Sequence, residues 1–198
     1  MIISRSSEGK KKNIVHSFMI ETLREAGLTL FDIEGVAVSI GPGSFTGLRV
    51  GLAAAKGICW ARGLPMAGVP SMKALAACVK SDRELFLTVK DAKRDEFYYG
   101  GFSISDGVLT QIIPDAVGSA EEILSVADRI WVTGPGVEAL RKRQNDLGKS
   151  TEIVYNPESL GGEVARLGSA MIASGQTLEP SDSAPVYIRI PAYVKKGA

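Results

Sequence analysis

The sequence predicts a two-part α/β protein, because two different orders of secondary structure follow one another along the chain. In residues 1–80, short β-branched runs alternate with helical patterns, which is typical of a sheet covered by helices. From residue 84 the pattern changes to consecutive strands separated by turn signals, which favours an antiparallel meander. We therefore expect an N-terminal domain over residues 1–80 and a C-terminal domain over residues 81–198.

The first part is predicted from hydrophobic periodicity and turn residues. Apolar residues at three- and four-residue spacing indicate an amphipathic helix that Gly27 closes. A β-branched run, a glycine-rich turn and a second helical pattern follow, and Ser71 is placed as the N-cap of a third helix. The expected elements are a helix over 14–26, a strand over 35–40, a helix over 46–61, a strand over 66–69 and a helix over 71–79.

The second part begins with three expected strands in "ELFLTVKDAKRDEFYYGGFSISDGVLTQI", where Asp106-Gly107 is a hairpin signal. The stretch "RIWVTGPGVEALRKRQ" then predicts a strand, a glycine-proline turn and a basic helix. A last amphipathic helix is expected in "GGEVARLGSAMIASG". The motif Gly-Pro-Gly therefore follows a predicted strand twice.

Composition excludes several classes of function. The 198 residues are 45% hydrophobic and 23% charged, which is enough to form a core. The net charge is +1, so no global positive field attracts nucleic acid, and an RNA contact would have to be local or supplied by a partner. No run approaches the roughly 20 apolar residues of a membrane span. We expect a cytoplasmic protein without membrane contact.

The cysteines do not predict a metal site or a disulfide. Cys59 and Cys78 lie in apolar helical patterns far from His16, the single histidine. Two buried thiols in a reducing compartment are the simplest interpretation. The sequence predicts no cofactor and no bound metal.

The stretch "SIGPGSFTGLRVG" is the most informative motif. Its glycines permit a sharp turn, and Ser44 or Thr46 can cap the following helix, whose N-terminal amides attract anions. A P-loop is excluded, because Gly47 is followed by Leu48 and Arg49 rather than by Lys-Ser or Lys-Thr. A generic anion cradle stays open.

The helix after this motif has a face of small residues, with Gly47, Gly51 and Ala55 four apart. Such a face allows close packing, either on the protein's own sheet or against a partner helix. Arg49 and Trp60, residue types enriched in binding hot spots, share one side of the helix. Both interpretations stay open.

Independent catalysis and direct RNA binding are two functions to compare with the sequence. The candidate catalytic groups form no recognisable set, and a chain with one histidine lacks the His-based clusters of a catalytic zinc site. Solvated faces routinely carry basic runs such as Lys10–Lys12 and Arg141–Arg143. The candidate catalytic groups are His16, Ser44, Thr46, Asp91, Asp95 and Glu96.

Four colinear segments resemble the bacterial TsaB family, formerly called YeaZ: "GPGSFTGLRVGLAAAKGICWARGLPMAGVPSMKALA", "VKDAKRDEFYYGGF", "VTGPG" and "APVYIR". The resemblance implies an ASKHA fold, the architecture of actin and sugar kinases, with two lobes and a degenerate nucleotide site. It implies a non-catalytic scaffold and activator of TsaD in the transfer of threonylcarbamoyl to the tRNA adenosine beside the anticodon. Expected partners are TsaD, the ATPase TsaE and a second copy when TsaD is absent, with tRNA reached only through the complex.

The resemblance also implies site residues. Partner binding falls on the helices that flank the glycine loop, and an anion or a nucleotide would lie near Asp91, Lys93 and Glu96. A nucleotide-binding ASKHA enzyme or a glycoprotease-like hydrolase is the alternative. The expected partner-binding residues are Val15, Phe18, Met19, Thr22, Gly43, Ser44, Phe45, Thr46, Gly47, Arg49, Val50, Gly51, Ala54 and Ala55.

One departure from the family pattern concerns the start of the chain. Family members begin with a strand of the type Ile-Leu-Ala-Ile-Asp-Thr-Ser and a hairpin, whereas this sequence starts near the family's third strand. The expectation is that the first lobe lacks two strands, through truncation or through a start assigned too late.

Overall fold

The computed structural model describes residues 15–189 apart from 127–128, 148–149 and 156–159. The chain forms two compact units. Unit 1 comprises residues 1–40, 44–70 and 158–185, and unit 2 comprises 41–43, 71–157 and 186–198. Each unit is described by itself below.

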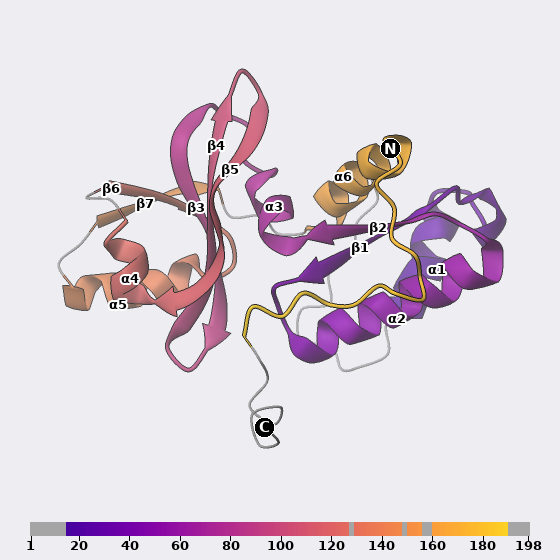
Figure 1. The fold of residues 1–198 in the computed structure, drawn as a ribbon, viewed down its shortest axis with the longest axis horizontal. Coiled ribbons are helices and arrows are strands. Elements are labelled where there is room, and N and C mark those ends of the chain that lie inside the picture. The colour runs from indigo at the N-terminus through magenta and orange to yellow at the C-terminus, as the bar shows by residue number, and fades with distance from the viewer. Residues whose placement is uncertain (1–14, 127–128, 148–149, 156–159, 190–198) are drawn as a thin grey trace. The chain divides into compact units, whose positions relative to one another are not determined.

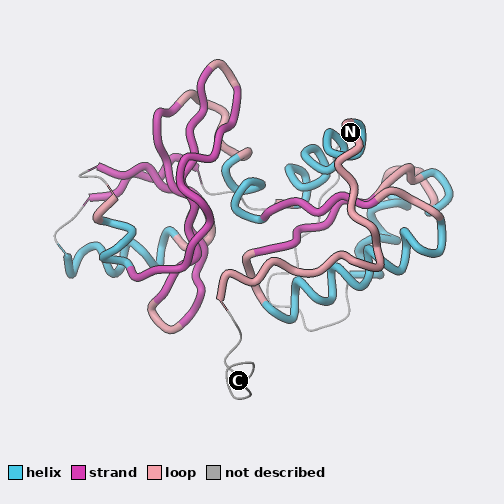
Figure 2. The backbone as a smooth tube through the Cα atoms, in the orientation of Figure 1, coloured by secondary structure: helices cyan, strands magenta, loops and turns pink. Residues whose placement is uncertain are grey.

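Unit 1 is a small sheet with helices on both faces (Figures 1 and 2). Strands β1 and β2 form a two-stranded sheet, and Figure 1 draws their arrowheads at the same end. Its elements are α1 (Val15–Glu25), the 3-10 helix η1 (Leu30–Asp32), β1 (Val36–Gly41), α2 (Phe45–Arg62), β2 (Met66–Pro70) and α6 (Gly161–Ala173).

Helices lie against both faces of β1, and on one face a glycine makes the close approach possible. On one face, a Cβ added to Gly168 of α6 would lie 2.2 Å from the Cβ of Ala37. On the other face, a Cβ added to Gly51 of α2 would lie 3.8 Å from a methyl group of Val38. Because neighbouring strand residues point to opposite faces, α6 and α2 cover different sides of the strand. The core on the α2 side contains Leu52, Ala55, Cys59 and Met66.

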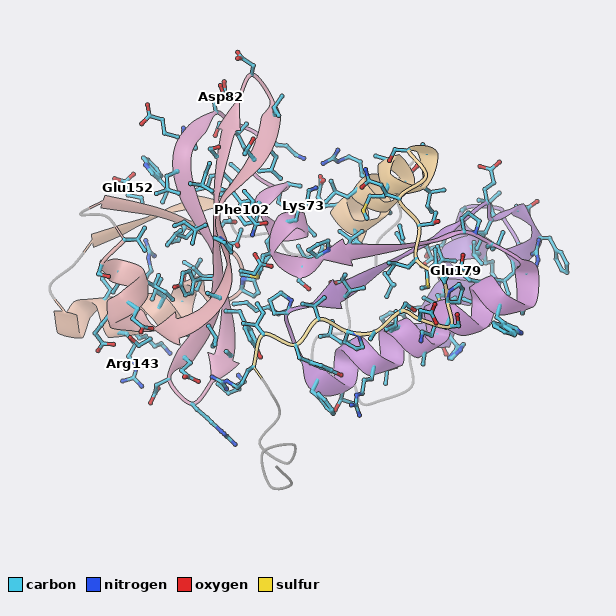
Figure 3. All side chains as sticks on the ribbon, viewed as in Figure 1. Lys73, Asp82, Phe102, Arg143, Glu152 and Glu179 are labelled. Carbon is cyan, nitrogen blue, oxygen red and sulfur yellow. The ribbon has the colours of Figure 1, made fainter. Side chains whose placement is uncertain are left out.

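Unit 2 is a mixed five-stranded sheet in the order β5-β4-β3-β6-β7. Strand β4 pairs antiparallel with β3 and β5, whereas β6 pairs parallel with β3 and β7. Apolar residues of β3 and β6 form a core with α4 and α5, and Figure 3 labels Phe102 on the side of the sheet where α3 lies. The elements are α3 (Ser71–Ala76), β3 (Arg83–Lys93), β4 (Glu96–Ser105), β5 (Val108–Ser119), α4 (Ala120–Leu124), β6 (Arg129–Thr133), α5 (Val137–Leu147) and β7 (Ser150–Tyr155).

Most of the predicted elements are confirmed within one or two residues. The hairpin signal is also confirmed, because Asp106 and Gly107 adopt the positive φ angles, 52° and 74°, that such a turn requires. The prediction for the third helix differs in two ways: Ser71 is the first residue of α3 rather than its N-cap, and α3 ends at Ala76 rather than at residue 79. The elements η1, α4 and β7 were not predicted.

The two units do not follow the order of the sequence. The sequence prediction divides the chain after residue 80, whereas the chain leaves unit 1 at Pro70 and returns to it at residue 158. The return has a physical reason in α6, whose glycine face packs on β1. Helix α6, from the C-terminal part of the chain, therefore packs on a sheet whose strands come from the N-terminal part.

Two helix-interior glycines give a matched test of this packing. Gly57→Ala should raise the free energy of unfolding by about 0.5–1 kcal/mol, because nothing lies within 4 Å of the added Cβ and alanine has the higher helix propensity. Gly168→Ala should lower it by about 1–3 kcal/mol, because the added Cβ would overlap that of Ala37. Urea denaturation measures both changes. Equal effects of the two substitutions would contradict the assigned packing.

Candidate functional site

Helix α2 presents three faces, and each has a different environment. The core face consists of the buried residues Leu48, Leu52, Ala55 and Cys59. A second face, which includes Gly51, Ala54 and Ile58, lines an apolar cavity of about 620 Å³. The third face points away from unit 1 and is exposed. The motif "SFTGLRVG" therefore begins a helix that has one face in the core and another face exposed.

The exposed face of α2 carries an apolar stripe at alternating spacings of four and three residues. Val50 is 42% exposed and Trp60 is 77% exposed, and two small exposed residues lie between them. This is the spacing of the contact residues in paired helices. We call it the α2 stripe; its residues are Thr46, Val50, Ala53, Gly57 and Trp60.

The structure divides the expected partner-binding residues between these faces. Ala55 is only 4% exposed and belongs to the core of unit 1, so a partner cannot reach it in this conformation. Arg49 stacks on Phe45, with its guanidinium carbon 3.8 Å from the ring centroid. Among the expected residues, those that line the apolar cavity are Val15, Phe18, Met19, Thr22, Gly51, Ala54 and Ala55, and those that are exposed are Ser44, Thr46, Gly47, Arg49 and Val50.

The first Gly-Pro-Gly loop is mainly structural in its contacts. Gly41 and Pro42 are buried, and Gly41 has a φ of 118°, which favours glycine. Ser44 caps α2, because its hydroxyl oxygen accepts a hydrogen bond from the Gly47 amide at 3.3 Å. The expected cap is thus confirmed at Ser44, and this amide is one of those that an anion would need.

The second Gly-Pro-Gly loop packs directly on β3. The Gly136 amide donates to the Val89 carbonyl at 3.0 Å, and a Cβ at Gly136 would lie 2.8 Å from the Cα of Lys90. The Lys90 ammonium in turn donates to the carbonyl oxygen of Pro42 at 3.3 Å. Both Gly-Pro-Gly loops therefore contact the same lysine, and burial lowers the pKa of that side chain.

The turn between β3 and β4 forms a charged cavity of about 460 Å³. Hydrogen bonds from the side chain and the backbone amide of Lys93 lower the pKa of Asp91. Asp95 pairs with Arg143 of α5, and Glu96 pairs with Arg189. The structure thus brings Asp91, Lys93 and Glu96 to one turn, where each carboxylate has a cationic partner.

The basic segment of α5 is partly neutralised by neighbouring acids. Arg143 is paired with Asp95, and Arg141 lies 4.0 Å from Glu138. Figure 3 shows Arg143 at the edge of unit 2 that carries α5. The other predicted basic run, Lys10–Lys12, lies outside the described residues.

Sequence reasoning missed Lys90 as a partly buried cation. The available signal was a lysine at the end of the apolar run "LFLTV", next to an expected strand end. Sequence reasoning noted Ala53 and Gly57 as small residues but did not assign them to the exposed side. That assignment needs the position of the sheet beneath the helix.

Comparisons with known proteins agree with this architecture. A family model described as "TsaD: tRNA N6-adenosine threonylcarbamoyltransferase" matches residues 7–177. Two solved structures from Pseudomonas aeruginosa are similar in fold, and one of them, titled YeaZ, has a TM-score of 0.70 at 23% identity over 87% of this chain and 83% of that one. The fold defines a two-lobed α/β protein of the ASKHA type.

Relatives with similar sequences identify the family within this fold. The chain is 31% identical over 183 residues to the Escherichia coli tRNA threonylcarbamoyladenosine biosynthesis protein TsaB, covering 85% of this chain and 76% of the relative. It is 34% identical over 101 residues to the Bacillus subtilis protein of the same name, covering 51% and 42%. A Streptococcus pneumoniae tRNA N6-adenosine threonylcarbamoyltransferase is 27% identical over 80% of this chain and 49% of that protein. The chain belongs to the TsaB family.

The matched region spans about half the length of two of these relatives, the Bacillus subtilis and Streptococcus pneumoniae proteins. Within the part of the chain that the structure describes, no helix is long and apolar enough to cross a membrane. The same residues contain no group of three or more His, Cys, Asp or Glu side chains that could hold a metal ion.

Lys90 should make the stability of the chain depend on pH in the alkaline range. Its pKa is lowered below 10.5 in the folded state, so burial of the ammonium opposes folding at neutral pH. This penalty disappears as the pH rises from the folded-state pKa towards 10.5. The free energy of unfolding of the unaltered chain, minus that of Lys90→Met, should therefore increase over this range.

Urea titrations at several pH values test this prediction, with Lys73→Met as the control at an exposed lysine of α3. A difference that stays constant for Lys90→Met, or that changes equally for Lys73→Met, would contradict the role of burial.

Proposed function

We propose that the chain acts in threonylcarbamoyladenosine biosynthesis as a non-catalytic accessory subunit, which holds TsaD in its active arrangement. TsaD then transfers the threonylcarbamoyl group to the tRNA adenosine beside the anticodon. Membership of the TsaB family supports the pathway. The observation that carries the scaffold role is the α2 stripe, an exposed helix face with the residue spacing and side-chain sizes of a helix partner site.

Gly57 is the most specific member of the α2 stripe. A glycine inside a helix costs about 1 kcal/mol relative to alanine, and no atom of unit 1 occupies the space above it. The fold itself therefore gives no reason for a glycine here. A partner helix that approaches closely would supply one, because Ala53 and Gly57 leave room for its backbone. Val50 and Trp60 flank this flat region with apolar surface.

The candidate catalytic groups support an accessory role rather than independent chemistry. Asp91, Asp95 and Glu96 each form an ion pair, and the Ser44 hydroxyl caps a helix. A general base or nucleophile needs a partner that activates it towards substrate. These groups instead have partners that fix the local fold.

We further propose the partners and the setting. TsaD is the main partner on the α2 stripe, a second copy of the chain takes its place when TsaD is absent, and TsaE joins the assembly with TsaD. The complex works in the cytoplasm and reaches tRNA through TsaD.

Reconstitution with TsaD, TsaE, tRNA and threonylcarbamoyl-adenylate tests the function: modified adenosine should form only when the chain is present. Product formed equally without the chain would contradict the proposal.

Gly57→Arg tests the partner site. Arginine favours helix and has open space within unit 1, so the variant should fold, but its side chain should block a close partner helix. We expect the dissociation constant for TsaD to rise by about 100-fold, equivalent to about 2.7 kcal/mol. Isothermal titration calorimetry measures the change.

Ile112→Arg is the matched control, because Ile112 is an exposed apolar residue of β5 and the substitution adds the same charge. Its affinity for TsaD should equal that of the unaltered chain. Full affinity of the Gly57→Arg variant would show that TsaD binds elsewhere.

The chain alone should bind tRNA weakly, with a dissociation constant above about 100 µM near 0.15 M salt. The net charge is only +1, and Arg141 and Arg143 lie beside acids. Fluorescence anisotropy with labelled tRNA measures this affinity, and Arg141→Ala with Arg143→Ala should leave it unchanged. Tight, salt-sensitive binding that the double variant loses would favour direct RNA recognition.

A further inference from the structure

The charged cavity of unit 2 has more cations than its carboxylates can neutralise. Residues of the β3–β4 turn and of α5 line it, and they include four cations and three carboxylates. Arg189 pairs with Glu96 and adds a fifth cation. The site therefore has an excess of two positive charges. The cations that line the cavity are Lys93, Arg94, Lys142 and Arg143, and the carboxylates are Asp91, Asp95 and Glu96.

Each carboxylate of the cavity already pairs with one cation. The pairs are Lys93–Asp91, Arg143–Asp95 and Arg189–Glu96. Among the residues that the structure describes, Arg94 and Lys142 take part in no ion pair. The residues that the family resemblance implies for an anion are thus used within the turn. The cations available to a ligand are instead Arg94 and Lys142.

The backbone of the turn fixes the position of Arg94. Lys93, Arg94 and Asp95 have left-handed φ angles of 64°, 59° and 60°, which are uncommon for residues other than glycine. The Asp91 carboxylate stabilises this turn, because it accepts a hydrogen bond from the Lys93 amide at 2.6 Å. Strained backbone of this kind is concentrated at sites that hold a ligand. The strain therefore supports a role for the turn beyond the connection of two strands.

The size and charge of the cavity select the kind of ligand. Its volume of about 460 Å³ is that of a small-molecule site, and the apolar residues Phe97 and Ala139 complete its lining. A phosphate monoester has a charge of about −1.5 to −2 at pH 7, which matches the two excess positive charges. A nucleic acid strand is a poorer fit, because its successive phosphates would be repelled by the three carboxylates.

We propose that this cavity binds a small organic phosphate monoester, whose phosphate group is held by Arg94 and Lys142. Arginine can donate two parallel hydrogen bonds to a phosphate, and lysine adds a compact positive charge from the other side of the cavity. The site lies within unit 2 and does not use the α2 stripe. The failure of either proposal would therefore leave the other unaffected.

Isothermal titration calorimetry of the full chain tests the proposal with AMP as the probe. AMP should bind with a dissociation constant below about 1 mM, and adenosine, which lacks the phosphate, should not. Arg94→Ala with Lys142→Ala should weaken AMP binding by at least about tenfold, because two charge-assisted hydrogen bonds are lost. Arg24→Ala with Lys73→Ala removes the same two charges at exposed positions of α1 and α3 and should leave the affinity unchanged.

Three results of this titration would overturn the proposal. The first is equal affinity of the two double variants for AMP, or no binding of AMP to the unaltered chain. The second is inorganic phosphate that binds as tightly as AMP, which would indicate a site for free phosphate. The third is a short RNA that binds more tightly than AMP and that the variant of Arg94 and Lys142 no longer binds, which would indicate a nucleic acid site.

Asp95→Asn tests the charge match in the opposite direction. Asparagine tolerates the left-handed conformation, so the turn should persist, and Arg143 is released from its ion pair. The affinity for AMP should rise about threefold. Glu84→Gln removes the same charge from an exposed position of β3 outside the cavity and should have no effect. An unchanged or lower affinity of the Asp95→Asn variant would overturn the charge match that selects the ligand.

Discussion

Unit 1 depends on the close approach of two helices to the two faces of β1. Gly168 brings α6 against Ala37, and α2 lies over Val38 at Gly51. On the α6 side a single methyl group is decisive, because packed interiors have little room for added volume. Residues of both helices and of β1 line the apolar cavity, and α2 contributes Leu52, Ala55 and Cys59 to the core. The packing thus requires the glycine of α6 at position 168, whereas a Cβ at Gly51 or Gly57 of α2 would meet no close contact.

The same helix uses small residues in two different ways. Inward, Ala55 is buried in the core, and Gly51 lies over Val38 and lines the apolar cavity. Outward, Ala53 and Gly57 face open space, where the fold tolerates any size. A list of small residues at four-residue spacing cannot distinguish these cases. The distinction matters for the proposed function, because the proposed partner site uses the outward set.

Local signals in the sequence account for most of the fold, and the exceptions have physical causes. Periodicity located α1, α2 and α6, and the left-handed pair Asp106-Gly107 located the β4–β5 hairpin. Helix α4 was missed although Ser119 and Glu122 form a capping box, because its single turn is too short for a periodic pattern. The return of α6 to unit 1 could not be predicted, because the complementarity of Gly168 and Ala37 is a contact between distant parts of the chain. Within the candidate site, the sequence predicted α2 and the Gly-Pro-Gly loop before it. It did not show which side of the helix or of the loop is exposed.

The two Gly-Pro-Gly loops show why a phosphate-loop interpretation of the sequence is too simple. An anion site needs free amides and an available cation. In the first loop the Gly47 amide donates to Ser44, and in the second the Gly136 amide donates to Val89. Lys90, the cation between the loops, donates to the Pro42 carbonyl and has a lowered pKa. The Gly136 amide and the Lys90 ammonium thus hold the two Gly-Pro-Gly loops against β3, and the Gly47 amide is used in the cap of α2.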